Sequence, residues 1–94
     1  MKKLIVYGVV QGVGFRPTVY RIAKAMGLRG WVKNNGSNVE IVVNENAEKI
    51  LEVLQANLPP NARISEIKIE EFEARCPEDF VILASSNGAK DFPP

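Results

Sequence analysis

Hydrophobic and polar residues alternate along several short stretches of the chain, which is the pattern of β-strands with one buried face. The stretches with this pattern lie at residues 4–10, 29–34, 38–44, 64–72 and 79–83. The first has apolar side chains on both faces, with Leu4 and Val6 on one face and Ile5, Tyr7 and Val9 on the other. We therefore expect it to be a central strand that helices cover on at least one side.

Two further stretches repeat apolar residues at every third or fourth position, as one side of a helix does. The first begins at Pro17, runs to about Met26 and is ended by Gly27. The second follows Asn46, whose side chain suits the N-cap position. Between the second and third strands, residues 34–38 are asparagine, glycine and serine, which favour a tight turn.

The order of these elements is βαββαβ with one more strand at the end. Two helices with one apolar stripe each can cover one face of an antiparallel sheet. The sequence therefore predicts an α+β fold, a ferredoxin-like βαββαβ sandwich with an antiparallel sheet. Both helices should lie on one face, and the short fifth strand should lie at an edge.

The length of 94 residues fits one domain, which we expect at residues 1–84, followed by a tail or the start of a linker at residues 85–94. A hydrophobic content of 46% and a charged content of 24% are typical of soluble globular proteins. The apolar run near the start alternates like a strand and lacks the cleavage pattern of a signal peptide. No apolar run is long enough to cross a bilayer. We expect a cytoplasmic protein that has no membrane partner.

The side chains available for chemistry are restricted. The chain has no histidine and a single cysteine, Cys76, which excludes an internal disulfide and a cysteine-based metal cluster. It also lacks the commonest general base at neutral pH. We expect no metal and no cofactor, so any catalysis would use arginine, asparagine, lysine, carboxylates and the backbone.

The charges are unevenly distributed, because seven lysines and arginines precede the first acidic residue, Glu40. This basic half could bind a small anion, bind nucleic acid, or pair with the acidic half after folding. The predicted third strand, residues 38–44, has no aromatic side chain on which a base could stack, which counts against RNA. We therefore expect no nucleic-acid partner.

The strongest candidate site is the loop between the first strand and the first helix. Its glycines allow backbone amides to converge without obstruction by Cβ atoms, and the helix dipole favours an anion there. The candidate phosphate ligands are Gln11, Gly12, Val13, Gly14, Phe15 and Arg16. A cation at a helix start is unfavourable, so a purely structural role for Arg16 is hard to justify. The glycines alone are weak evidence, since the loop is neither a Walker A motif nor a dinucleotide fingerprint.

Asn34 ends the predicted second strand, where its simplest role is to begin the turn. However, residues 10–16 (Val-Gln-Gly-Val-Gly-Phe-Arg) and residues 30–34 (Gly-Trp-Val-Lys-Asn) together resemble the two signatures of the acylphosphatase family. The resemblance covers nearly the whole chain. It implies a ferredoxin-like fold and metal-independent hydrolysis of carboxyl phosphates. It also implies that the loop amides and Arg16 hold the phosphate while Asn34 orients the attacking water.

Residues 14–21 and the short hairpin at residues 34–40 are also similar to the N-terminal acylphosphatase-like domain of the carbamoyltransferase that matures nickel-iron hydrogenases. This similarity implies that zinc-binding and carbamoyltransferase domains follow in the full-length protein. Two functions stay open. The chain could be a monomeric acylphosphatase acting on small acyl phosphates, carbamoyl phosphate among them. Alternatively, it could be a non-catalytic domain that binds phosphate or carbamoyl phosphate for a larger protein.

Overall fold

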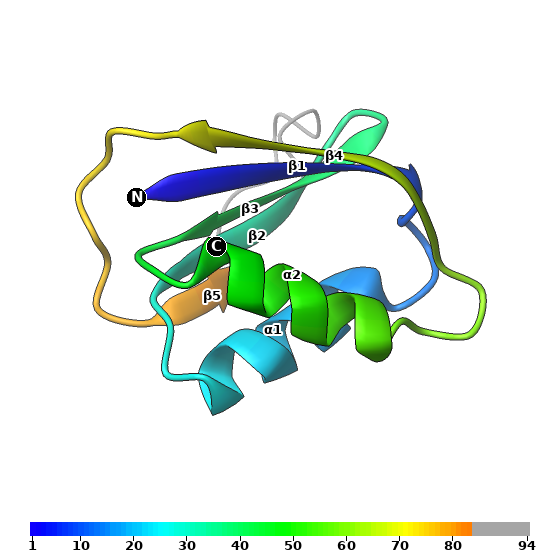
Figure 1. Ribbon diagram of the computed structural model, residues 1–94, viewed down its shortest axis with the longest axis horizontal. Helices are drawn as coiled ribbons and strands as arrows, with labels where there is room; N and C mark the ends of the chain where they lie inside the picture. Colours follow the sequence, from blue (N-terminus) through cyan, green and yellow to red (C-terminus); the bar gives the residue numbers. More distant parts are fainter. Residues whose placement is uncertain (84–94) are drawn as a thin grey trace.

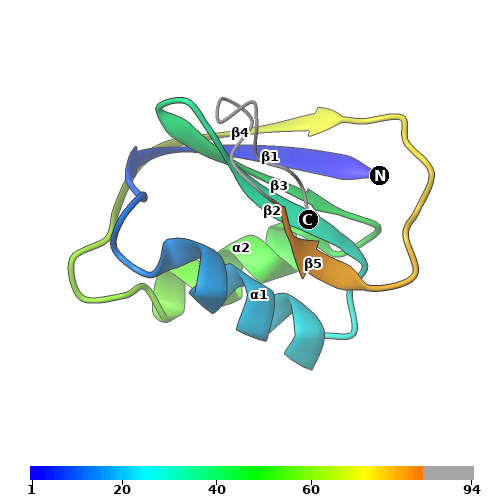
Figure 2. The ribbon, with the colours of Figure 1, turned by 180° about the vertical axis from the view of Figure 1, so that it is seen from behind.

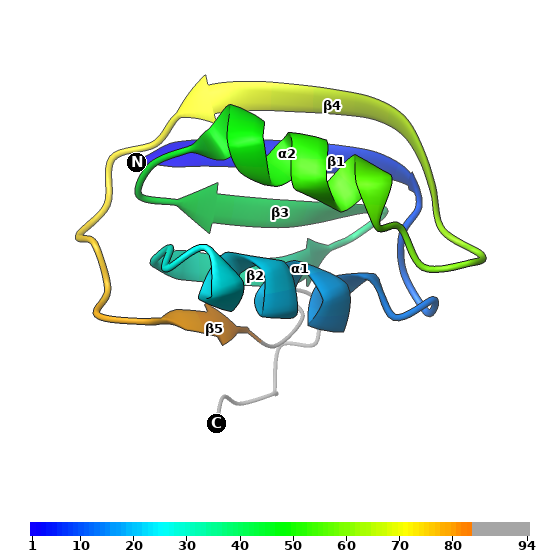
Figure 3. The same cartoon turned by 60° about the horizontal axis from the view of Figure 1, so that its bottom comes forward.

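The computed structural model describes residues 1–83 of the chain, and the predicted tail at residues 85–94 lies outside them. Within the described residues the fold is built on a five-stranded sheet in the order β4-β1-β3-β2-β5. The strands are β1 (Lys2–Val9), β2 (Gly30–Asn35), β3 (Asn38–Val43), β4 (Arg63–Glu71) and β5 (Phe80–Ile82). The helices are α1 (Phe15–Ala25) and α2 (Ala47–Ala56), and both lie on the same face of the sheet (Figures 1 and 3). The predicted βαββαβ order with a fifth strand is confirmed.

The predicted antiparallel sheet is confirmed for four strands, and the fifth, edge strand, whose direction the sequence left open, is parallel to its neighbour. The β1–β3, β1–β4 and β2–β3 pairs are antiparallel, but β5 pairs with β2 in parallel. The chain between β4 and β5, residues 72–79, passes the ends of the intervening strands to reach the opposite edge (Figure 3). Strand β5 therefore starts at the end where β4 stops and runs opposite to β4. That direction is also the direction of β1 and β2, so the sheet is mixed.

The first helix starts two residues earlier than the sequence predicts. Gly14 is its N-cap, with a left-handed φ of 80°, and Phe15 is its first helical residue. Pro17 is thus the third helical residue, where its missing N–H removes no bond within the helix. The consequence for the site is that Arg16 lies in the first turn of α1 and not in the loop.

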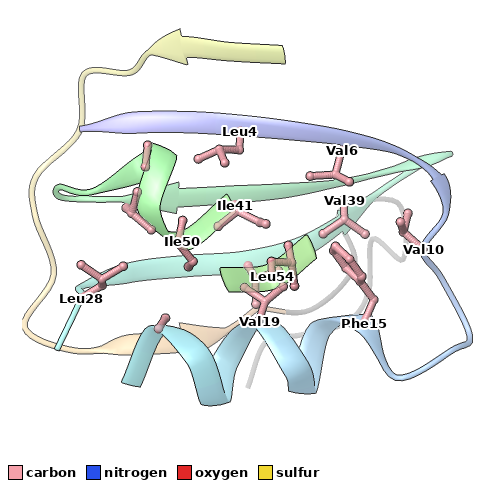
Figure 4. Close-up of a cluster of buried hydrophobic side chains, with 14 of the residues drawn as sticks. Leu4, Val6, Val10, Phe15, Val19, Leu28, Val39, Ile41, Ile50 and Leu54 are labelled. Carbon is pink, nitrogen blue, oxygen red and sulfur yellow. The ribbon is translucent and has the colours of Figure 1, made fainter. Parts of the chain in front are cut away.

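The hydrophobic core fills the space between the sheet and the two helices (Figure 4). The predicted helical stripes are confirmed, because Val19 and Ala23 of α1 and Ile50 and Leu54 of α2 are buried. The fully buried sheet residues include Leu4, Val6, Val32, Val39, Ile41, Val43 and Phe80. Burying one such side chain contributes about 1.5–3 kcal/mol, so this layer holds the helices and the loops next to them in place.

Asn46 occupies the predicted N-cap position of α2, but its side chain makes no capping hydrogen bond. Its backbone is left-handed, with φ at 57°, a conformation that asparagine tolerates better than most residues. No helix within residues 1–83 combines the length and the apolarity that crossing a bilayer requires.

Candidate phosphate-binding site

The topology of the sheet brings the two predicted site segments to the same end of the molecule. Strands β1 and β2 are both antiparallel to β3, so they run in the same direction and end on the same side. Strand β1 leads into the glycine loop and α1, whereas β2 ends in Asn34, Asn35 and the hairpin to β3. Figures 1 and 2 show the loop, the start of α1 and this hairpin at one end of the sheet.

The pairing register also defines which way Asn34 faces. Val6 of β1, Val39 of β3 and Asn34 of β2 form one row across the sheet. Directly paired residues of antiparallel strands project their side chains to the same face. Val6 and Val39 are fully buried in the core beneath the helices, together with Phe15 (Figure 4). Asn34, paired with Val39, therefore projects to the helix-covered face. Phe15 is the neighbour of Arg16 in the chain.

The side-chain oxygen of Asn34 is an unusual feature of this row. Its Oδ1 is buried and has no hydrogen-bond partner within the described part of the chain. A buried carbonyl oxygen normally accepts a hydrogen bond, from the protein or from water. The arrangement is therefore suited to accept a hydrogen bond from a molecule bound at this end of the sheet.

The loop before α1 offers a set of uncommitted backbone amides. No residue within 1–83 accepts a hydrogen bond from the N–H groups of residues 12–16, and the first bonded amide is that of Thr18. Gly12 and Gly14 have φ angles of 74° and 80°. Residues with a Cβ atom rarely adopt this left-handed conformation, which bends the loop here. Free amides at a helix N-terminus bind anions, and the first turn of α1 contains no acidic residue to compete with one.

Thr18 braces this loop, a role that the sequence analysis missed. Its hydroxyl donates to the Gly14 carbonyl at 2.9 Å, and its backbone N–H donates to the same oxygen at 3.3 Å. Thr18 is a buried polar residue on the otherwise apolar side of α1. A threonine on the buried stripe, four residues after a glycine N-cap, is the sequence signal that could have identified it.

The guanidinium of Arg16 carries the positive charge of the site. Arg16 is partly buried as a residue, and its guanidinium makes no ion pair with any residue in 1–83. The lysines of the basic half, in contrast, have carboxylate partners. The pairs are Lys2 with Glu71, Lys3 with Glu40, Lys24 with Asp79 and Lys33 with Glu40. Folding thus pairs these four lysines with carboxylates, whereas Arg16, like Arg21 and Arg29, forms no ion pair within residues 1–83 and can bind an anion.

Gln11 connects the loop to the hairpin that follows Asn34. Its Nε2 donates to the carbonyl oxygens of Gly36 at 2.7 Å and Asn38 at 3.0 Å. Phe15, another predicted ligand, is 1% exposed in the core, and Val13 packs against the core, so their backbone amides are the groups that can reach an anion. The phosphate-binding roles of these residues stay predictions.

The pKa shifts resolved in the protein lie away from this site. The Glu71 carboxylate raises the pKa of Lys2, and the Lys2 ammonium lowers the pKa of Glu71. In a second pair, the hydrogen bond between Lys24 and Asp79 raises the pKa of Lys24 and lowers the pKa of Asp79. Residues 1–83 also contain no group of three histidine, cysteine or acidic side chains placed to hold a metal ion.

The acylphosphatase family model matches residues 2–82 of this chain. An acylphosphatase of Caldivirga maquilingensis is 40% identical over 82 residues, covering 83% of this chain and 84% of that protein. The carbamoyltransferase HypF2 of Cupriavidus necator is 47% identical over 88 residues, covering 89% of this chain. A crystal structure of full-length HypF in its phosphate- and nucleotide-bound form superposes with a TM-score of 0.81 at 37% identity, covering 89% of this chain.

These relatives differ greatly in length. This chain spans 84% of the Caldivirga protein, 11% of the Cupriavidus protein and 12% of the HypF chain in the crystal structure. The similarity therefore extends both to a protein of comparable length and to a small part of much longer ones.

Proposed function

Because this chain belongs to the acylphosphatase family, we propose that it hydrolyses the carboxyl–phosphate bond of small acyl phosphates without a metal ion. One observation carries the proposal. The uncommitted amides of residues 12–16 and the unpaired guanidinium of Arg16 lie at the same end of the sheet as the unpartnered oxygen of Asn34. An anion and a water molecule can therefore be bound side by side.

The loop and Arg16 would hold the phosphate group. Several N–H donors and a guanidinium around one phosphate compensate the charge on its oxygens. In phosphoryl transfer the protein acts mainly by positioning the reactants and stabilising the charge on the transferring oxygens. These groups can supply both effects.

Asn34 would position the attacking water. An amide is not a base, but its Oδ1 can accept a hydrogen bond from the water and aim the water oxygen at phosphorus. A bond then forms between the water oxygen and phosphorus, and the bond from phosphorus to the acyl oxygen breaks. The leaving carboxylate has a low pKa and needs no proton from an acid, and the substrate phosphate takes the proton of the water. The absence of histidine from the chain is compatible with this scheme.

A second candidate function follows from the length of the relatives. Because the chain spans 11% of the Cupriavidus carbamoyltransferase, it could serve as a phosphate-binding or carbamoyl-phosphate-binding domain of a longer protein. In that case zinc-binding and carbamoyltransferase domains would follow it, and the cytoplasm would be its location. The free amides and Arg16 would then bind the ligand without turnover.

The test is hydrolysis of benzoyl phosphate and of carbamoyl phosphate by the parent chain and three variants. We expect Arg16→Ala and Asn34→Ala each to lower kcat/KM by about 100-fold or more. Arg29→Ala is the matched control, because it removes an exposed arginine that precedes β2, at the opposite end of that strand from Asn34. A folded parent that binds phosphate but hydrolyses neither compound would refute the enzymatic function and support the second candidate.

A further inference from the structure

The side chain of Gln11 joins two segments that are far apart in the chain. It belongs to the loop after β1, and its Nε2 bonds the carbonyls of Gly36 and Asn38, which are 25 and 27 residues away. The two carbonyls flank Ser37 in the β2–β3 hairpin. The two bonds therefore attach Gln11 to two separate points of the hairpin turn. Asn34 lies two residues before Gly36 on the same hairpin.

These bonds leave Gln11 poorly suited to hold the phosphate with its side chain. A glutamine amide nitrogen has two hydrogens, and here both are directed to carbonyl oxygens, at 2.7 and 3.0 Å. The remaining polar atom is Oε1, which only accepts hydrogen bonds and would repel a phosphate oxygen. The side chain is thus committed to the hairpin, whereas Arg16 makes no ion pair within residues 1–83 and can bind the anion.

We infer that Gln11 is a positioning residue that holds the water-binding Asn34 in register with the phosphate-binding loop. This inference rests on the proposed function. The loop and Arg16 belong to the β1–α1 segment, and Asn34 belongs to the β2–β3 hairpin. Attack in line with the leaving group requires a defined distance between these two segments. A displacement of about 1 Å in such a site lowers the rate about 100-fold.

The inference predicts a specific kinetic defect. In Gln11→Ala the amides and Arg16 still bind phosphate, but Asn34 is no longer held against them. We expect kcat to fall by about 10- to 100-fold, while KM and the inhibition constant of inorganic phosphate change by about twofold or less. Gln11→Asn, which is one methylene shorter and cannot reach both carbonyls, should show a smaller defect of the same kind. Gln55→Ala is the control, because Gln55 is exposed on α2 and its side chain makes no hydrogen bond within residues 1–83.

A double-mutant cycle separates positioning from a direct contact with substrate. If Gln11 acts through Asn34, Gln11→Ala should lower kcat by about threefold or less once Asn34 is already alanine. Equal effects of Gln11→Ala in the presence and absence of Asn34 would overturn the inference. So would a raised KM with an unchanged kcat, which would make Gln11 a phosphate ligand.

A measurement without substrate keeps this inference separate from the proposed function. Backbone ¹⁵N relaxation of the ligand-free protein should show increased motion of residues 36–38 in Gln11→Ala and not in Gln55→Ala. If the parent proves inert but the hairpin loosens in this way, the link made by Gln11 stands and the proposed hydrolysis fails. If the hairpin amides move as they do in the parent, Gln11 does not hold the hairpin and the inference is wrong.

Discussion

The side-chain oxygen of Asn34 is buried without a partner in the described residues, and such an atom opposes folding. An unsatisfied buried acceptor costs about 1–3 kcal/mol relative to one that is hydrogen-bonded. The position lies in strand β2, where a β-branched residue would suit the backbone better. Stability therefore does not explain an asparagine at this position, whereas the proposed role of Asn34 in orienting the attacking water would explain it.

This reasoning predicts that stability and activity change in opposite directions. Asn34→Val removes the orphaned oxygen, and we expect it to raise the free energy of unfolding by about 1 kcal/mol while hydrolysis is lost. Urea unfolding and an acyl phosphate assay on the same preparations would measure both quantities. Arg16→Ala should lose activity without this gain. A less stable Asn34→Val protein would mean that the Asn34 side chain makes a stabilising contact within the fold.

At the scale of the elements, the hydrophobic pattern was sufficient to place the strands and helices. Period-two and helical patterns report which side of each segment is buried. Here every helix and strand except β4 contributes a buried side chain to one continuous core, and β4 packs against that core with the partly buried Ile64 and Ile67. The start of α1 was misplaced, because Pro17 suggested the first helical position whereas the left-handed backbone of Gly14 begins the helix. The direction of β5 was not predicted, because it depends on the path of residues 72–79 around the sheet, which no local pattern contains.

The part of the candidate site that consists of residues adjacent in the sequence could be predicted from the sequence. The glycine loop and Arg16 are contiguous in sequence, so turn chemistry and charge were enough to propose them. The orientation of Asn34 depends on its pairing with Val39, and the bonds of Gln11 connect residues 25 and 27 positions apart. These features arise only once the sheet is assembled, and residue types alone do not reveal them.

The short edge strand β5 is connected to α1 by a titratable pair. Lys24 of α1 donates a hydrogen bond to Asp79 at 2.6 Å, and Asp79 also accepts the Phe80 N–H at 2.8 Å. The Lys24 hydrogen bond is the main cause of the lowered pKa of Asp79, and the Phe80 amide adds to it. A carboxylate whose pKa is lowered by folding stabilises the fold above its ordinary value of 3.8, and this contribution is lost as the pH falls through the folded pKa.

Asp79→Asn tests this contribution, because the amide keeps an acceptor for Phe80 but removes the charge. We expect a small decrease in the urea midpoint at neutral pH, since both side chains are solvent-exposed. The difference between parent and variant should vanish below the folded pKa of Asp79, where the carboxyl is neutral. On the alkaline side it should shrink as the pH rises above 10.5 through the raised pKa of Lys24. A difference that is independent of pH would show that the charge pair does not stabilise this edge.

At the scale of the whole molecule, the two candidate functions share the same binding site and differ in turnover. A protein of similar length, the Caldivirga acylphosphatase, and a much longer one, the Cupriavidus carbamoyltransferase, are both close relatives, so length alone does not separate the functions. Under either candidate function of this chain, an anion would bind residues that come together only in the folded state. Binding therefore has to couple to global stability.

Inorganic phosphate should raise the unfolding temperature of the parent chain in a concentration-dependent manner. A ligand that binds only the folded state at one site adds about 2.7 kcal/mol to the free energy of unfolding at a hundred times its Kd. Thermal unfolding at increasing phosphate, with ionic strength held constant by chloride, would measure this effect. We expect the shift to be lost in Arg16→Ala, which lacks the charged ligand, and retained in Asn34→Ala, which lacks only the group that orients water. Equal shifts in the parent and in Arg16→Ala would place phosphate elsewhere on the molecule and would remove the basis of both candidate functions.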